Sequence, residues 1–305
     1  MKAAPIALFV YNRPAHTMRT IEALQKNDLA AASDLYVFAD GPKANTPARD
    51  LLNIEKVRSM VSGISGFRSV NLIFSEVNKG LSRSLTGGIN KIFEKEESLV
   101  IVEDDILTSR YFLSFCNEAL DKYKDDEKVM GISGYTYPVE KKGNQAYFLR
   151  TGACWGWATW RHAWQQFSFD AVAHLEEIKS RNLVEKFDFD GTAAYYKMLH
   201  HQVQGKIDSW AICWYASIFL AGGLVLFPSQ SLTINTGMDG SGTHYKKNQE
   251  AAQVDKDFTG ERREWNWPAI VEADPEMKSK LNKYFSRVSA SSLKEKIKRL
   301  LIHGI

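Results

Sequence analysis

The stretch Leu99-Val100-Ile101-Val102-Glu103-Asp104-Asp105 places three carboxylates directly after four apolar residues. Three of these apolar residues are β-branched and no polar residue interrupts them, which is typical of a strand buried on both faces of an α/β sheet. Crowded carboxylates repel one another unless a cation or hydrogen-bond donors compensate their charge. Ligands of open α/β sheets bind beyond the carboxyl ends of strands. The stretch indicates either a cation and phosphate site or a solvated acidic turn before the next helix.

Strand and helix patterns alternate through the first 135 residues. Strands are expected at 6–11, 35–39, 70–74, 99–102 and 129–133, and helices at 16–26, 47–62, 81–93 and 111–123. This order predicts an α/β fold with a mostly parallel central sheet and helices on both faces. Asn12, Arg13 and Asp40 follow the first two strands, so they are expected at the same sheet edge as the acidic triplet. Neither a dinucleotide-binding glycine pattern nor a Walker A motif follows the first strand.

The pattern changes after about residue 136. Aromatic-rich helices are expected at 157–164 and 210–220, and a pair of strands, 225–227 and 232–235, leads into a glycine-rich segment. No linker composition separates the two halves. We therefore expect a change of role within a single compact unit.

The composition excludes several classes of protein. The 305 residues include 39 basic and 36 acidic side chains, a net charge of +3 that argues against nucleic acid as a main partner. The three cysteines are widely spaced, without zinc-binding spacing, and their odd number argues against a disulfide framework. No signal peptide and no apolar run of transmembrane length is present. A cytoplasmic protein is expected.

Two motifs suggest contacts to an anionic substrate and a proton transfer. Lys79 and Arg83 are four residues apart, so they share one face at the start of a helix, which suits a diphosphate. The alternative is an ordinary solvated face. Asp208 stands two residues before Trp210 and suits a general base in an aromatic pocket. The alternative is a helix cap, the commonest role of Asp or Ser at such a position.

The tryptophans and the glycine-rich segment also allow two interpretations each. Trp155, Trp157 and Trp210 are candidate platforms for sugar rings, or else core residues. Glycines in segment 236–244 make it a candidate lid that orders over a bound ligand, or a loop whose backbone approaches phosphate. His244 at its end is a candidate metal ligand, or an exposed side chain.

The C-terminal segment 292–303 combines an apolar helical stripe with basic residues. Four basic side chains stand against one acidic side chain. A basic amphipathic end is typical of a helix on an anionic membrane surface. The alternative is a helix that packs on the body of the protein.

Together these segments resemble a known family, the bacterial family-two-type glycosyltransferases of GT-A fold that are related to N-acetylglucosaminyltransferase I and include a hemolysin-like group. The resemblance spans residues of about 4–245. Its carriers are Phe9-Val-Tyr-Asn-Arg-Pro14, Phe38-Ala-Asp-Gly41, Asn78-Lys-Gly-Leu81, Glu103-Asp-Asp105, Trp155-Gly-Trp157, Asp208-Ser-Trp210 and Gly237-Met-Asp-Gly-Ser-Gly-Thr-His244. Where the relatives have two adjacent aspartates before the tryptophan, this chain has Asp208-Ser209.

The resemblance implies a role for each site residue. Asp105 and His244 would bind Mn²⁺ or Mg²⁺, and Asp208 would be the catalytic base. Trp155, Trp157 and Trp210 would contact the acceptor. The residues expected to contact the nucleotide-sugar donor are Asn12, Arg13, Asp40, Lys79, Arg83, Glu103, Asp104, Ser241 and Thr243.

The implied activity is that of a metal-dependent, inverting hexosyl- or N-acetylhexosaminyltransferase. It would use a UDP-sugar and a saccharide or lipid-linked saccharide acceptor in bacterial surface polysaccharide synthesis. Residues 1–135 would bind the donor and 136–288 the acceptor, while 289–305 would attach the protein to the inner face of the membrane. The alternatives are a sugar nucleotidyltransferase and a non-catalytic carbohydrate- or nucleotide-binding module.

Overall fold

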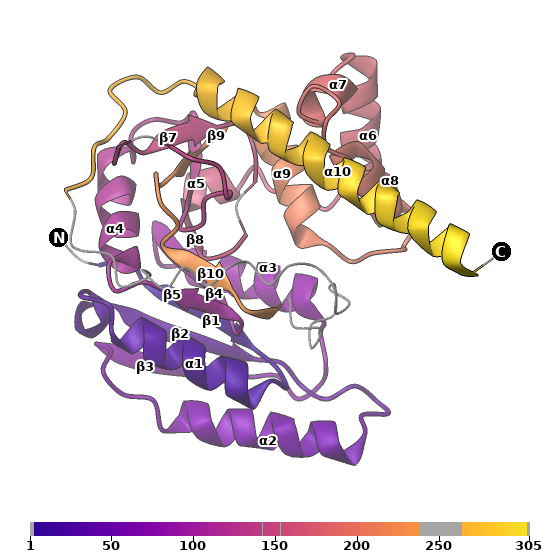
Figure 1. Cartoon of the computed structure of the whole chain (residues 1–305). Helices are drawn as coiled ribbons and strands as arrows, with labels where there is room; N and C mark the ends of the chain where they lie inside the picture. Colours follow the sequence, from indigo (N-terminus) through magenta and orange to yellow (C-terminus); the bar gives the residue numbers. More distant parts are fainter. Residues whose placement is uncertain (1–2, 142, 153, 238–263, 304–305) are drawn as a thin grey trace.

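An eight-stranded sheet with the order β3-β2-β1-β4-β8-β6-β9-β7 runs through the part of the chain that the structure describes (Figure 1). The structure is a computed structural model, and it describes residues 3–141, 143–152, 154–237 and 264–303. The sheet strands are β1 (Ile6–Val10), β2 (Asp34–Ala39), β3 (Ser69–Phe74), β4 (Ser98–Glu103), β6 (Val129–Ser133), β7 (Tyr147–Leu149), β8 (Trp157–Trp160) and β9 (Leu224–Phe227). A small second sheet pairs β5 (Ile106–Thr108) with β10 (Thr233–Asn235).

Most strands of the large sheet point the same way. β1 pairs in parallel with β2 and β4, β2 with β3, and β6 with β9, whereas β8 is antiparallel to both β4 and β6 and β7 is antiparallel to β9. Only β7 and β8 therefore run against the other strands of this described sheet. The predicted α/β class with a mostly parallel sheet is confirmed.

Helices cover both faces of the sheet (Figure 1). The helices are α1 (Pro14–Gln25), α2 (Ala48–Ser62), α3 (Leu81–Phe93), α4 (Phe112–Lys122), α5 (Arg161–Trp164), α6 (Ala171–Ser180), α7 (Val184–Phe187), α8 (Tyr195–Val203), α9 (Trp210–Leu220) and α10 (Pro275–His303), with a short 3₁₀ turn η1 (Ala30–Ala32). α1 and α2 pack against each other on one face. α3 lies on the other face, because a Cβ at Gly88 would meet the Phe9 and Phe38 rings. α9 shares that face, since Trp210 stacks on Trp157 of β8.

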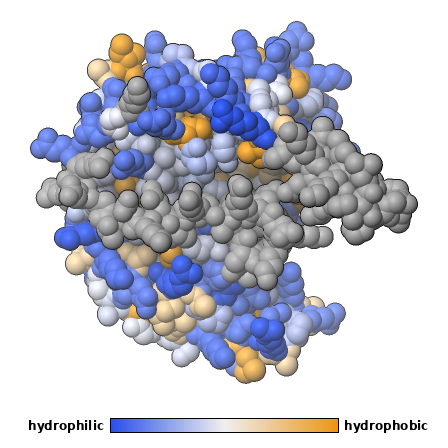
Figure 2. Space-filling model, viewed as in Figure 1, coloured by the Kyte–Doolittle hydropathy of each residue, from blue (hydrophilic) through white to orange (hydrophobic). Residues whose placement is uncertain are grey.

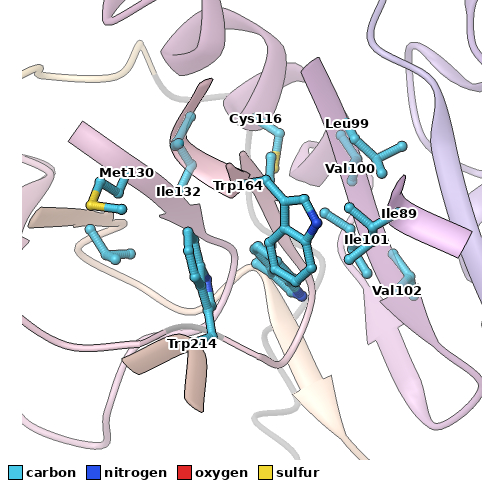
Figure 3. Packing of buried hydrophobic residues seen from close by; sticks show 14 of the residues in the cluster. Ile89, Leu99, Val100, Ile101, Val102, Cys116, Met130, Ile132, Trp164 and Trp214 are labelled. Carbon is cyan, nitrogen blue, oxygen red and sulfur yellow. The ribbon is translucent and has the colours of Figure 1, made fainter. Parts of the chain in front are cut away.

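The four apolar residues of β4 form the centre of the core. Leu99, Val100 and Ile101 are fully buried, and Val102 is nearly so. Figure 3 shows them between Ile89 of α3 and the residues of the later strands. Burial on both faces explains why this strand lacks the alternation of a half-exposed one.

Two details of the predicted second half are wrong. The predicted helix at 157–164 is the strand β8, followed by the single turn α5, because residues 157–160 pair with β4 on one side and β6 on the other. The predicted strands near 225–227 and 232–235 both exist, but they do not pair with each other. β9 lies between β6 and β7, and β10 joins β5. Strands β5 and β7 were not predicted.

Strands from both halves of the chain interleave in the large sheet. β8 inserts between β4 and β6, and β9 and β7 extend the sheet beyond β6. The two halves therefore share one core in the described structure. The division into donor-binding and acceptor-binding halves remains a prediction.

The first half of α10 packs on the body of the protein. Met277 and Leu281 are fully buried, and the Phe285 ring contacts the rings of Tyr137 and Phe189. In Figure 1 the C-terminal end of this helix extends toward the edge of the molecule. On the face drawn in Figure 2, hydrophobic residues occur in small groups among hydrophilic ones. Within the described residues, no helix is both long and apolar enough to cross a membrane.

Candidate active site

An arginine from the end of β1 joins two carboxylates from the end of β4. The two strand ends are adjacent because Phe9 of β1 is in register with Glu103 of β4. Arg13 donates to Asp104 through Nε, 3.2 Å from Oδ2, and through Nη2 to Oδ1. Arg13 Nη1 lies 3.0 Å from Asp105 Oδ2. The predicted cluster of Arg13, Asp104 and Asp105 is therefore present.

The cluster carries more negative than positive charge. Asp104 and Asp105 share the single guanidinium of Arg13, and the carboxyl of Glu103 lies within its electrostatic influence. Burial raises the pKa of Glu103 well above its usual value, and the charges of Asp105 and Asp104 raise it further. Burial also raises the pKa of Asp104 to about 6, although Arg13 opposes this shift. Burial lowers the pKa of Arg13, but the two aspartates outweigh it and keep this side chain cationic.

This donor set fits a divalent cation completed by substrate. Mg²⁺ and similar hard cations often use only one or two protein carboxylates, together with water and substrate phosphates. The Asp105 side chain keeps 13% of its surface exposed, against 6% for Asp104, so Asp105 is the more accessible ligand. Within the described residues, no group of three or more His, Cys, Asp or Glu side chains is arranged to hold a metal ion. The residues present therefore do not form a closed, all-protein metal site.

The glycine-rich segment begins in direct contact with Asp105. The backbone N–H and the hydroxyl of Thr236 both donate to the Asp105 carbonyl oxygen, at 2.8 and 3.0 Å. A Cβ at position 237 would lie 2.1 Å from Asp105 Oδ2, so any other residue there would displace this carboxylate from its place beside Arg13. The sequence suggested a lid but gave no sign of this contact, because the pairing of β10 with β5 that creates it was not predicted. The later candidates Ser241, Thr243 and His244 lie outside the described residues.

Asp40 anchors the segment that leads into α3. Its carboxylate accepts hydrogen bonds from Asn78 Nδ2 at 3.0 Å and from the backbone N–H groups of Gly41, Lys79 and Gly80 at 2.9 to 3.0 Å. Gly80 takes the positive φ of 77° that this turn requires. These bonds give Asp40 a structural role that its position after β2 did not reveal. The contact predicted between Asp40 and the donor remains a prediction.

Asp208 lies beside the same turn. Its carboxylate Oδ2 would be 3.9 Å from a Cβ at Gly80, and Ser82 Oγ donates to its carbonyl oxygen at 3.2 Å. The helix cap of α9 is Ser209, whose hydroxyl accepts from the Ile212 N–H at 3.4 Å. The motif therefore does cap the helix, as the alternative interpretation predicted, but the capping residue is Ser209 and not Asp208. Its side chain is exposed, as a base that meets an incoming acceptor must be.

The three candidate acceptor tryptophans differ in burial. Trp157 and Trp210 are only 1% and 3% exposed, and their rings stack with centroids 5.4 Å apart. Their burial supports the core-packing alternative and leaves no open ring face for a sugar. The helical spacing expected for Trp157 is also wrong, since it lies in β8. Trp155 is half-buried against Tyr135, so of the three only Trp155 presents surface.

The remaining donor candidates are Lys79, Arg83 and Asn12, which is the chain neighbour of Arg13. Lys79 and Arg83 line a cavity of about 150 Å³ beside α3, over β2 and β3. Asn12 is half-buried directly after β1. The structure thus forms two groups: Arg13 with residues 103–105, and Asp40 with the start of α3 and Asp208. The first group carries negative charge, and the second borders cationic side chains.

Comparison with known proteins does not assign the chain to a family. No protein-family model matches it, and no curated protein matches it. Among solved structures, the crystal structure of S. aureus TarS is similar at 13% sequence identity with a TM-score of 0.33, over 47% of this chain and 24% of that chain. The match thus spans about a quarter of the TarS chain. Such low similarity supports no argument about activity, so the proposal below rests on the site.

Proposed function

We propose that this protein is a metal-dependent glycosyltransferase of the GT-A type. It transfers a hexosyl or N-acetylhexosaminyl group from a UDP-sugar to a saccharide or lipid-linked saccharide acceptor, with inversion, in bacterial surface polysaccharide synthesis. The observation that carries the proposal is the pair of carboxylates of Asp104 and Asp105 that share one cation, Arg13, at the carboxyl ends of β1 and β4. This edge of an α/β sheet is where a nucleotide-containing ligand binds.

Asp105, Arg13 and Gly237 each have a defined task in this proposal. Asp105 would hold Mn²⁺ or Mg²⁺, and the metal, when bound, neutralises charge on the departing diphosphate. Arg13 keeps Asp104 and Asp105 in fixed orientations through its three contacts. Gly237 leaves room for Asp105, so the glycine-rich segment can start against the same carboxylate.

Asp208 acts on the acceptor in this proposal. Its carboxylate takes the proton from the acceptor hydroxyl that attacks the anomeric carbon from the side opposite the leaving group. A single displacement of this kind inverts the anomeric configuration. Its exposed position at the start of α3 and α9 leaves it free for this task.

The location of the protein is proposed from its basic, amphipathic C-terminal segment, residues 292–303. We infer a cytoplasmic enzyme that attaches to the inner face of the cell membrane through its C-terminal tail. A lipid-linked acceptor would be found at that surface. No nucleic acid is involved.

Calorimetry of the variant Asp105→Asn tests the proposal. We expect this variant to lose Mn²⁺-dependent UDP binding, because the change removes the proposed metal ligand, which is more exposed than Asp104. Asp28→Asn is a matched control, since it removes one carboxylate from an exposed ion pair with Arg110 and should leave UDP binding unchanged. Undiminished Mn²⁺-dependent UDP affinity in Asp105→Asn would contradict the metal assignment.

The reaction products separate the alternatives. A glycosyltransferase releases UDP from a UDP-sugar, whereas a sugar nucleotidyltransferase releases pyrophosphate from a nucleoside triphosphate. A binding module releases neither. UDP release by the purified protein, stimulated by Mn²⁺, is the expected result.

A further inference from the structure

A cationic groove runs along α3, away from the carboxylate cluster. Its cavity of about 150 Å³ lies between α3 and the strands β2 and β3, with Lys79, Arg83 and Lys91 among its lining residues. Arg83 and Lys91 lie in one row on α3, at steps of four residues through Gly87, whereas Lys79 stands before the helix, which begins at Leu81. Gly87 continues this row and leaves it open, since a Cβ there would meet nothing within 4 Å.

In the described structure, no acidic side chain lines this groove beside its cations. Within the described residues, the cavity lining contains no Asp or Glu, and none of the three cations forms an ion pair. Phe38 and Ile73 give the groove an apolar floor, and Ser84 adds a hydroxyl. The matching ligand has negative charges along one side and apolar surface along the other.

The length of the groove determines the size of that ligand. Arg83 and Lys91 are eight residues apart, about 12 Å along the helix axis. A diphosphate would reach both cations only if the two side chains bent toward each other. A chain with acidic groups along its length can pair with each cation where it stands, so an extended acidic chain is the better match. Sugar rings linked in a chain meet both requirements, because their faces are apolar and their substituents can be acidic.

The groove leads to the proposed catalytic base. Lys79 stands at the end of the groove nearest the start of α3. Its backbone N–H donates to the Asp40 carboxylate at 2.9 Å, and the next residue, Gly80, borders Asp208. A chain bound along α3 would therefore have one end beside Asp208. Lys79 and Arg83, predicted from sequence as donor contacts, are in this arrangement better placed for the acceptor.

We propose that the α3 groove, defined by Lys79, Arg83 and Lys91, binds an extended acidic saccharide as the acceptor of the transfer. This inference rests on the proposed glycosyltransferase function. It specifies the acceptor class, an anionic glycan whose reactive end meets Asp208. The inference rests on the match between the cations that line the groove and the acidic groups of such a saccharide.

Fluorescence anisotropy with a labelled oligogalacturonide tests the groove directly. The wild-type protein should bind this probe at low salt and should not bind a neutral cello-oligosaccharide of the same length. Arg83→Gln and Lys91→Gln should each weaken binding about fivefold, as expected for the loss of one ion pair of about 1 kcal/mol. Lys95→Gln, which removes an exposed lysine just beyond α3 and outside the groove, should not change binding.

Three outcomes would overturn the proposal: equal binding of the neutral oligosaccharide, an equal effect of Lys95→Gln, and displacement of the probe by saturating UDP with Mn²⁺. The last would place Lys79 and Arg83 in the donor site. Failure of the enzymatic proposal is recognised separately. If the wild-type protein releases no UDP from any UDP-sugar, the activity is wrong, and probe binding to the groove then identifies a binding protein for acidic saccharides.

Discussion

Three aspartates at strand ends show what a single residue's position does and does not reveal. The order of strands predicts that Asp40, Asp104 and Asp105 lie at one edge of the sheet, and the structure places them there. Their environments differ, because they depend on loop conformations that a short sequence window does not specify. Backbone N–H groups surround the Asp40 carboxylate, whereas Asp104 and Asp105 share one arginine. Sequence alone therefore locates a site but not the partner of each carboxylate.

The role of Asp208 is the sharpest prediction at this scale. Asp208→Asn should reduce transfer by roughly 10²- to 10⁴-fold, the usual contribution of a positioned base, with normal UDP binding. Ser209→Ala is the matched control, since Ser209 is the cap of α9. That variant should lower stability by about 1 kcal/mol and leave turnover of the folded protein intact. Near wild-type turnover in Asp208→Asn would remove Asp208 from the mechanism.

At the scale of elements, long periodic segments were predictable and short paired ones were not. The helices α3 and α9 were predicted to the residue. Gly80, with its positive φ, precedes α3, and the Ser209 hydroxyl caps the start of α9. The strand β8 was mistaken for a helix. Its four residues are too few to show a period, and its partners β4 and β6 are distant in sequence. The same reason explains why β5 and β7 were missed.

Two adjacent glycines of α3 predict opposite effects on stability. Gly87→Ala should stabilise the protein by about 0.5–1 kcal/mol, because alanine loses less backbone entropy in a helix and a Cβ at this position meets nothing. Gly88→Ala should destabilise it, since its Cβ would lie 2.7 Å from the Phe9 ring and must displace a packed aromatic pair. Thermal unfolding of the two variants measures both effects. Equal shifts of Tm would show that α3 does not pack on β1 and β2 as described.

The start of α10 makes stability depend on pH in the acid range. Partial burial raises the pKa of Asp274, but hydrogen bonds from Lys141 Nζ at 2.6 Å and the Met277 N–H at 2.9 Å outweigh it and lower the pKa below its usual value. A carboxyl whose pKa is depressed by folding stabilises the native state above its unfolded pKa. That contribution is lost as the pH falls below about 4 and through the lower folded value.

Asp274→Asn should therefore flatten the acid limb of the stability curve. The variant should also lose stability at pH 7, where the wild-type carboxylate is charged and bonded. Urea unfolding between pH 2 and pH 7 measures both changes. Asp121→Asn, in an exposed pair with Lys124, is the control and should leave the curve almost unchanged. An identical slope in Asp274→Asn and wild type would exclude this ion pair as a source of the pH dependence.

At the scale of the whole molecule, the last helix links the folded body to a basic tail. The sequence predicted an amphipathic helix at residues 292–303, and the structure shows one continuous helix from Pro275 to His303. Its first half is part of the core, because Met277, Leu281 and Phe285 pack on the body. This first half was not predicted, since it begins in a separate stretch after the glycine-rich segment. The body and the tail can therefore be separated after residue 290.

Removal of residues 291–305 should abolish membrane attachment and spare the catalytic body. Basic side chains near an anionic surface contribute about 1 kcal/mol each, so the four in this tail give a weak attachment that salt screens, and its apolar residues add to it by insertion. The truncated protein should fail to sediment with anionic liposomes at low salt and should release UDP from its donor at the wild-type rate. Neutral liposomes are the control, and the full-length protein should bind them poorly.

If the truncated protein sediments like the full-length one, the tail is not the anchor. If truncation lowers Tm strongly, residues 291–303 stabilise the body, and the alternative of a packed helix is correct.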